Sequence, residues 1–332
     1  MKVFTLNGYF NYGNRLQAFA MAKVLKKFSN EIGFYWPRNL KEMIKETLKY
    51  YTPLRFKYRK ELKLKKFTKK HTPLTFTYND IVSIIGSDQV WNPDYFKNAI
   101  YLLNGNPSGM NVSYAASMGI ETLTNEQKEL FRKALKNYKA ISVREKTAKE
   151  LLQPLTDKKI EVVLDPTLLL DEAEYKKIEK KPRDIKLGEK YVLCYILGSP
   201  EHQKIIEDFA DKNGYPVIMF SDKKNSSYGV EEFLYLVRHA ELICTDSFHA
   251  SVFSFIFDRP LLIFKRSGVA NYMYSRLQNL VDTFKLTSCQ FDGARILEEN
   301  LSVDYTDGKK ILKKEREKSL KFLKDALEGC ND

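Results

Sequence analysis

Short apolar runs alternate with helix-like segments along almost the whole chain, and this order limits the possible folds more than any other feature. Strand-like runs end in polar loops and are followed by stretches with helical periodicity. A first set of strand-like runs covers 2–6, 81–85, 111–115, 140–143 and 160–164. A second set covers 191–197, 216–220, 242–245 and 261–264. Such alternation predicts mostly parallel sheets with helices on both faces.

The chain is too long for one hydrophobic core. At 332 residues it exceeds the usual size of a single domain, so two α/β domains are expected. The pattern predicts a first domain at 1–167, a linker with a short helix at 168–190 and a second domain at 191–307. An amphipathic, strongly charged helix is predicted in the last segment, 308–332. Two such domains of similar size would face each other across a cleft.

The positive charge of the chain is concentrated in one segment. The formal net charge is +13, and between Arg38 and Lys70 basic residues outnumber acidic ones about four to one. Apolar residues from Leu40 to Tyr51 recur there at helical spacing, and a basic amphipathic helix of this kind suits an anionic membrane surface. The alternative is a solvated lysine face on a helix that packs against the domain. The segment is therefore predicted as a basic insert at about 38–70.

Composition excludes several classes of protein. No apolar run approaches the roughly 18 residues that a membrane span requires, and the first residues lack the apolar core of a signal peptide, so a cytoplasmic protein is expected. The four cysteines are widely spaced and the histidines do not cluster with them, so no metal site is expected. The positive charge of the chain is the one feature that suggests nucleic-acid binding. The basic residues are not accompanied by aromatic side chains that could stack on bases or by the motif of a DNA-recognition helix.

The segment 242–250 joins a short apolar strand to polar residues that end in His249. An apolar run at 251–257 follows and suits a buried helix, so His249 is expected at a strand-to-helix turn. In open α/β sheets ligands bind there, at the carboxyl ends of strands, and an imidazole moves protons near neutral pH. The alternative is a hydrogen-bonded structural histidine.

Six motifs follow one another along the chain, and most follow a predicted strand. They are Asn-Tyr-Gly-Asn-Arg-Leu-Gln at 11–17, Gly-Ser-Asp-Gln-Val-Trp at 86–91, Ser-Tyr-Ala-Ala-Ser-Met-Gly at 113–119, Ser-Val-Arg-Glu at 142–145, Leu-Asp-Pro-Thr at 164–167 and Thr-Asp-Ser-Phe-His at 245–249. Together they resemble the polysaccharide pyruvyl transferase family. The resemblance extends from residue 3 to about residue 280, and six ordered motifs are far more specific than one.

The resemblance implies two Rossmann-like domains that face a cleft, similar to the GT-B glycosyltransferases. It also implies phosphoenolpyruvate as the donor substrate, no cofactor, and a cyclic pyruvate ketal on a sugar as the product. Other members often have Arg-Leu-His-Gly where this chain has Ser-Phe-His-Ala at 247–250, so a basic residue before the histidine is absent. Donor binding is then expected to depend on other cations.

Catalytic and donor-binding roles can be assigned to particular residues. His249 is the expected general acid, and Asp88 is expected to act on the acceptor hydroxyl, with turn capping as the alternative. Donor binding is assigned to Arg144, Lys265 and Ser247. Arg144 can form a bidentate clamp on a carboxylate or phosphate, although a surface ion pair would explain it too. Arg266 beside Lys265 offers further positive charge.

Acceptor binding is assigned to side chains of the first two loops. The predicted acceptor-binding residues are Asn11, Asn14, Arg15, Gln17, Gln89 and Trp91. The first four open a helix, where backbone amides and the helix dipole favour anions or sugar hydroxyls. Trp91 would stack on a sugar ring, with burial in the core as the alternative. Asp246 would orient His249 or cap the helix that follows.

The predicted reaction belongs to the synthesis of capsular, exopolysaccharide or cell-wall precursors. Such acceptors are usually carried on a lipid pyrophosphate, which would give the basic insert a reason to contact the inner face of the cell membrane. The alternative function is a nucleotide-sugar-dependent glycosyltransferase of the same two-domain shape. It would need contacts to a base and a ribose in the second domain, and no motif in the sequence supplies them.

Overall fold

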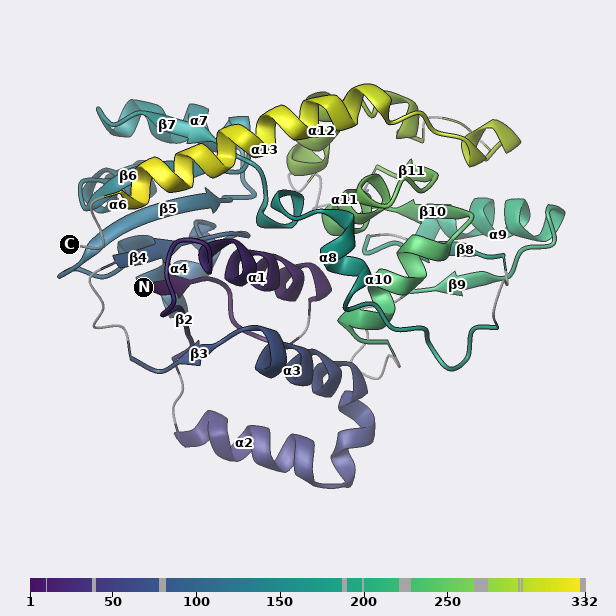
Figure 1. The fold of residues 1–332 in the computed structure, drawn as a ribbon, viewed down its shortest axis with the longest axis horizontal. Helices are drawn as coiled ribbons and strands as arrows, with labels where there is room; N and C mark the ends of the chain where they lie inside the picture. The colour runs from purple at the N-terminus through teal and green to yellow at the C-terminus, as the bar shows by residue number, and fades with distance from the viewer. Residues whose placement is uncertain are drawn as a thin grey trace.

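The fold is taken from a computed structural model of the chain. The structure describes residues 1–9, 11–37, 40–77, 82–186, 190–198, 200–220, 228–265, 274–291, 293 and 295–328. Within these residues it contains two parallel sheets, each with helices packed against it, and the two α/β units lie side by side (Figure 1). The predicted α/β fold with two parallel-sheet units is confirmed.

The first sheet has seven described strands in the order β3-β2-β1-β4-β5-β6-β7, and every pairing is parallel. Its strands are β1 Lys2–Phe4, β2 Gly33–Tyr35, β3 Leu74–Thr75, β4 Val82–Ile85, β5 Met110–Ala116, β6 Tyr138–Val143 and β7 Ile160–Val162. All four side chains of the central strand β4 are buried, as expected for a parallel sheet that is covered on both faces.

The second sheet has four described strands in the order β11-β10-β8-β9, also parallel. They are β8 Val192–Tyr195, β9 Val217–Met219, β10 Leu242–Thr245 and β11 Leu261–Ile263. The sequence predicted all four; β10 coincides with its apolar run, and the other three are somewhat shorter than theirs. It did not predict β2 and β3, because two or three residues are too few to show a periodicity.

The helices cover both sheets and link the two units. They are α1 Tyr12–Leu25, α2 Leu40–Tyr51, α3 Arg59–His71, α4 Phe96–Ala99, α5 Tyr101–Asn104, α6 Asn125–Leu135, α7 Lys146–Leu152, α8 Glu172–Lys176, α9 Gln203–Lys212, α10 Val230–His239, α11 Phe248–Ile256, α12 Tyr274–Phe284 and α13 Thr306–Leu327. Helix α11 begins three residues before the predicted run, because Ser247 is its N-cap residue.

The basic insert is two helices rather than one. Helices α2 and α3 are joined by the 3₁₀ helix Pro53–Tyr58, which corrects the expectation of a single amphipathic helix. A proline begins this turn, where its missing N–H group costs no helical hydrogen bond. In Figure 1, α3 lies beside α1, and α2 lies farther out at the edge of the molecule.

Helix α1 lies between the two units and is buried on nearly all sides, with Lys23 as its one exposed side chain. Its Tyr12 ring packs on Phe220 and Phe233 of the second unit, at centroid distances of 4.7 and 5.6 Å. One hydrophobic cluster therefore extends from the first unit into the second. Aromatic contacts therefore close this part of the interface.

The last helix, α13, crosses from the second unit to the first (Figure 1). The Leu164 amide donates to Ser319 Oγ at 3.0 Å, and the Arg316 guanidinium donates to the carbonyl groups of Leu168 and Leu170 at 2.9 and 3.0 Å. Helix α13 thus fixes the segment that follows β7, directly beside the candidate site.

Candidate active site

His249 lies in the first turn of α11, at the carboxyl end of β10, and is 8% exposed. The imidazole ring packs against the first turn of α1. A Cβ atom added to Gly13 would lie 1.9 Å from His249 Nδ1, so only glycine leaves room for the ring. The start of α1 therefore fixes the position of this histidine across the interface between the two units.

A buried carboxylate connects His249 to the Arg144 guanidinium of the first unit. His249 Nε2 lies 3.8 Å from Asp165 Oδ2, and the same oxygen accepts a hydrogen bond from Arg144 Nη1 at 2.8 Å. Asp165 follows β7 and Arg144 follows β6, so the carboxyl ends of two adjacent strands hold the carboxylate and the guanidinium. The imidazole and the guanidinium meet at the interface through one shared carboxylate.

The protonation states follow from burial and charge. Burial lowers the pKa of the His249 imidazole below its ordinary value, although Asp165 and Asp88 act in the opposite direction. Burial alone would raise the pKa of the Asp165 carboxyl, but His249 and Arg144 bring it below its ordinary value. At neutral pH the imidazole is therefore neutral and Asp165 is ionised. His249 Nε2 has no hydrogen-bond partner among the described residues.

Asp88 lies on the loop after β4, with a positive φ of 73°, a conformation that aspartate tolerates better than most residues. Its Oδ2 accepts a hydrogen bond from Asn14 Nδ2 at 3.2 Å, and its Oδ1 lies 3.7 Å from Arg144 Nη2. Burial alone would raise the pKa of the Asp88 carboxyl, yet nearby cations, Arg144 first, bring it below its ordinary value. Asp88 is therefore a second ionised carboxylate beside His249.

The loop before Asp88 depends on Gly86. Gly86 has a φ of 133°, and a Cβ atom at this position would lie 2.0 Å from the Tyr114 carbonyl oxygen. A side chain is excluded both by the backbone conformation and by the neighbouring strand. The loop can therefore approach β5 closely enough to carry Asp88 into the interface.

Arg144 is buried beneath the site at 4% exposure. Its guanidinium carbon lies 4.6 Å from the centroid of the Phe248 ring, a cation–π contact that links the two units. Its Nη1 binds Asp165, whereas its Nε and Nη2 have no hydrogen-bond partner among the described residues. Two donors of a buried, charged group thus remain available for a ligand.

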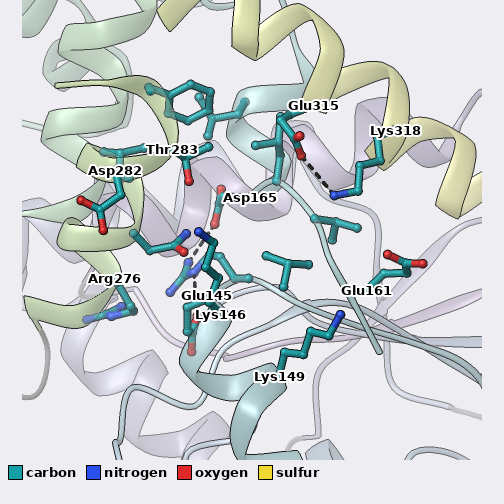
Figure 2. Close-up of a pocket in the computed structure, with 18 of the residues that line it drawn as sticks. Glu145, Lys146, Lys149, Glu161, Asp165, Arg276, Asp282, Thr283, Glu315 and Lys318 are labelled. Carbon is teal, nitrogen blue, oxygen red and sulfur yellow. Dashed lines mark hydrogen bonds and ion pairs between the residues drawn. The ribbon is translucent and has the colours of Figure 1, made fainter. Parts of the chain in front are cut away.

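Two cavities lie beside these residues. The smaller has a volume of about 190 Å³, and its lining includes Asn11, Asn14, Asp88, Gln89, Ser247 and His249. The larger has a volume of about 800 Å³ and is lined by residues between β6 and α8 and by residues of α12 and α13, with Arg144, Glu145 and Asp165 among them. Phe248 and Arg276 line both cavities, so these two residues stand at their junction. Figure 2 shows the larger one.

The predicted acceptor-binding residues of the motif at 11–17 lie in two different surroundings. Asn11 is the N-cap residue of α1, its side chain accepts a hydrogen bond from the Asn14 amide, and both asparagines line the smaller cavity. Arg15 and Gln17 do not line it. Arg15 donates to the Leu6 carbonyl at 2.6 Å, and Gln17 is fully buried with hydrogen bonds to Thr5 and Ser87. The predicted contact of Arg15 and Gln17 with an acceptor is wrong, because both are occupied in holding loops together.

Trp91 is fully buried, so the prediction that it stacks on a sugar is wrong. Its Nε1 donates to the Leu102 carbonyl at 3.1 Å, and its ring packs edge-on against Tyr138 at 5.6 Å. Asp246 accepts hydrogen bonds from the Leu197 and Gly198 amides, each at 2.7 Å. The carboxylate that pairs with His249 is that of Asp165 instead.

Lys265, predicted to bind the donor, is exposed after β11 and lines neither cavity. Arg266 lies outside the described residues. The cation at the junction of the cavities is Arg276 on α12, which the sequence analysis missed because no motif or strand precedes it. It also missed Asp165, although the Asp-Pro-Thr motif after a strand carried the signal.

Among the residues that the structure describes, no group of three or more His, Cys, Asp or Glu side chains could hold a metal ion. No described helix combines the length and the apolar character that crossing a membrane requires.

Comparisons with known proteins identify the family. An uncharacterized protein from Klebsiella pneumoniae subsp. pneumoniae NTUH-K2044 has a similar fold, with a TM-score of 0.50 and 10% sequence identity over 88% of this chain and 92% of that one. The UDP-GlcNAc 2-epimerase of Methanocaldococcus jannaschii matches with a TM-score of 0.43 and 13% identity over 94% and 97% of the two chains. No curated protein matches the sequence. The family model for polysaccharide pyruvyl transferase matches residues 11–268, so the chain belongs to the polysaccharide pyruvyl transferase family.

Proposed function

We propose that this protein transfers the pyruvate unit of phosphoenolpyruvate onto two hydroxyl groups of a sugar in a polysaccharide precursor. The products are a cyclic pyruvate ketal and inorganic phosphate. The family supports transfer to a polysaccharide. The single observation that carries the proposal is the setting of the smaller cavity, where a buried imidazole meets two helix N-termini and one arginine.

The smaller cavity is the proposed donor site. A volume of about 190 Å³ suits a ligand of phosphoenolpyruvate's size better than a saccharide. The first turns of α1 and α11 both border it, and helix N-termini favour anions. Ser247, the N-cap residue of α11, makes no side-chain cap hydrogen bond, which leaves amides of the first turn for an anion. Arg276 adds a positive charge at the rim.

Arg144 is also proposed to act on the donor. Its Nη2 is buried, has no hydrogen-bond partner among the described residues and lies next to Asp88. With Nη1 bound to Asp165, the guanidinium keeps Nη2, beside Asp88 of the smaller cavity, as a donor for a carboxylate or phosphate. No lysine could keep this geometry, because its ammonium group is a single point of charge.

The proposed chemistry moves two protons. One acceptor hydroxyl forms a bond to C2 of phosphoenolpyruvate and C3 takes a proton, then the bond from C2 to the phosphate oxygen breaks and the second hydroxyl closes the ketal. One hydroxyl proton ends on C3 and the other on the released phosphate. We assign the proton transfer to His249, whose neutral ring can accept a proton and pass it on. Asp88 is proposed to accept a hydrogen bond from the attacking hydroxyl.

Asn11, Asn14 and Gln89 are the proposed contacts for the reacting end of the acceptor. All three line the smaller cavity, and amide groups both donate to and accept from hydroxyl groups. Gln89 Nε2 is buried without a hydrogen-bond partner among the described residues, so it has a donor available.

Thermal stabilisation by candidate donors tests this proposal. Phosphoenolpyruvate is expected to raise the melting temperature, because a ligand that binds only the folded state at a hundred times its Kd adds about 2.7 kcal/mol of stability. Arg276→Ala is expected to reduce the shift, and Lys313→Ala, an exposed lysine elsewhere on α13, is the matched control. Stabilisation by uridine or guanosine diphosphate sugars without any by phosphoenolpyruvate would favour the glycosyltransferase alternative instead.

We further propose that the acceptor is carried on a lipid pyrophosphate and that α2 contacts the inner face of the cell membrane. Ile44, Leu48 and Tyr51 form one stripe on α2 and are 53, 55 and 72% exposed. The opposite face is polar: Tyr50 and Lys49 bind Glu61 of α3. Helix α2 thus presents its apolar face outward, on a segment, 40–71, that holds twelve Lys and Arg residues against three Glu.

Vesicle flotation tests this contact. Binding to phosphatidylserine vesicles is expected to exceed binding to phosphatidylcholine vesicles, since each basic residue near an anionic surface adds about 1 kcal/mol. Ile44→Glu with Leu48→Glu should abolish binding, whereas Leu130→Glu, an exposed leucine on α6, should not. Equal recovery with neutral and anionic vesicles contradicts the proposal.

A further inference from the structure

The larger cavity has no assigned ligand, and its floor contains a buried polar pair with unmet hydrogen bonds. Glu145 is 2% exposed, and its Oε1 accepts hydrogen bonds from Ser117 and Met118. Its Oε2 has no hydrogen-bond partner among the described residues, and neither has Arg144 Nε, 3.8 Å away. Buried polar atoms without partners are costly, so this pair requires an explanation.

A hydroxyl group satisfies both members of this pair at once. A hydroxyl donates one hydrogen bond and accepts two, whereas a carboxylate only accepts and a guanidinium only donates. A phosphate or carboxylate ligand would be repelled by Glu145, and an ammonium group by Arg144. The floor of the cavity therefore favours a neutral ligand that carries hydroxyl groups.

The charges of the walls lead to the same ligand class. The lining has five basic residues, Arg144, Lys146, Lys149, Arg276 and Lys318, and six acidic residues, Glu145, Glu150, Glu161, Asp165, Asp282 and Glu315. The two signs are interspersed, as the labelled side chains in Figure 2 show, and Lys318 pairs with Glu315 at 3.4 Å. A nearly neutral wall gives no net attraction to a phosphorylated donor but many hydrogen-bonding groups for hydroxyls.

The size and position of the larger cavity also suit a saccharide. A volume of about 800 Å³ lies in the range of cavities that hold ligands larger than a single sugar. Apolar side chains such as Val163, Leu280 and Ile311 share the lining and can cover the C–H faces of sugar rings. Because Phe248 and Arg276 line both cavities, a ligand here can extend to the smaller one, where His249 lies.

We infer that the larger cavity is a saccharide-binding site that holds the sugar units next to the one that receives pyruvate. This inference rests on the proposed function, because it takes the smaller cavity as the donor site. The reacting sugar then stands at the junction beside Phe248 and Arg276. Residues of α12 and α13 would select the acceptor, which makes these two helices the determinants of acceptor specificity.

Saturation-transfer NMR with lactose, maltose and cellobiose as probes tests the inference. At least one of them is expected to bind the wild-type protein weakly and saturably. Glu315→Trp fills the cavity from α13 and is expected to weaken binding at least tenfold. The matched control is Glu317→Trp, two residues along the same helix on an exposed position outside the lining, and it should bind as the wild type does.

Saccharide binding and the thermal shift by phosphoenolpyruvate together distinguish a failure of this inference from a failure of the proposed function. Loss of saccharide binding in Glu315→Trp, together with an unchanged thermal shift by phosphoenolpyruvate, supports the saccharide site. Equal binding to Glu315→Trp and the wild type, or no binding of any of the three probes, overturns it. Neither of these results affects the donor assignment, since the thermal shift by phosphoenolpyruvate requires no sugar.

Discussion

The surroundings of the His249 imidazole disfavour its protonated, positively charged form as long as no anionic ligand is bound. It is buried, and the first turns of α1 and α11 both direct their positive dipole ends toward this region. An anionic donor in the smaller cavity would reverse this effect and raise the pKa of His249. The histidine would then be ready to accept a proton only when the substrate is present.

The pH dependence of the rate follows from this arrangement. The pH profile of kcat/KM reports the free enzyme, so its acidic limb should lie below 6.5, the ordinary pKa of histidine, because burial lowers the pKa of His249. The limb in kcat should lie at higher pH, because the bound donor raises that pKa. A free-enzyme limb above pH 6.5 would contradict the assignment of this limb to His249.

A methyl group at Gly13 is expected to act through His249. Gly13→Ala places an atom 1.9 Å from His249 Nδ1, so the ring must move. A displacement of about 1 Å can cost about 10²-fold in rate, and a fall of that size in kcat/KM is expected. The clash should also cost stability, so Gly13→Ala is expected to destabilise the wild type in urea unfolding but not the His249→Ala variant, and equal losses in both backgrounds would show that Gly13 acts elsewhere.

Breaking the buried pair of Arg144 and Asp165 should destabilise the fold. Asp165→Ala leaves a buried guanidinium without its close partner, and such a loss typically costs about 3–5 kcal/mol. Urea unfolding measures the difference. Glu172→Ala, which breaks a surface pair with Lys176, is the control and should cost less than about 1 kcal/mol. Similar losses in both variants would mean that the buried pair adds no special stability.

Individual site residues could be predicted where they follow strands. His249, Asp88 and Arg144 come directly after apolar runs, and the carboxyl ends of parallel strands meet at one edge, so their convergence followed from the sequence. The sequence left the burial of Trp91 open as an alternative and did not indicate the burial of Gln17. Trp91 follows a polar loop and Gln17 lies in α1, and only the packing of distant segments decides whether such a side chain faces a ligand or the core.

Amphipathic helices usually pack through their apolar faces. Helices α2 and α3 instead pack through polar side chains and leave the apolar stripe of α2 exposed. Salt bridges hold them together: Lys65 binds Glu46 at 2.8 Å, and Lys49 binds Glu61. The sequence predicted the apolar stripe of α2. It left open whether the stripe points outward to a membrane or inward to the domain, because periodicity gives the existence of a face and not the direction in which it points.

The histidine at the end of α3 makes stability depend on pH. Burial, with Lys70 and Lys23, lowers the pKa of His71 to about 4, and its ring packs on Phe19 and Phe67. The unfolded chain binds this proton near pH 6.5, so the contribution of His71 to stability is lost as the pH falls from about 6.5 to about 4. His71→Gln should flatten this part of the stability profile measured by urea unfolding. An unchanged slope would contradict the prediction.

The whole molecule is two α/β units held together beside the site. The sequence predicted both units from their alternating strands and helices. It did not predict how α13 returns to the first unit, since one amphipathic stripe does not identify the surface that it will cover. This return explains how Arg316 and Ser319, near the end of the chain, come to hold the segment that carries Asp165.

The most direct test is to incubate the pure protein with phosphoenolpyruvate and a panel of lipid-linked saccharides, and to follow phosphate release together with the mass of the saccharide. One saccharide is expected to gain a single pyruvate ketal for each phosphate released. His249→Ala is expected to abolish both signals while phosphoenolpyruvate still stabilises the variant. Phosphate release without a gain in mass would rule out pyruvate transfer, and full turnover by His249→Ala would rule out His249 as the proton-transfer group.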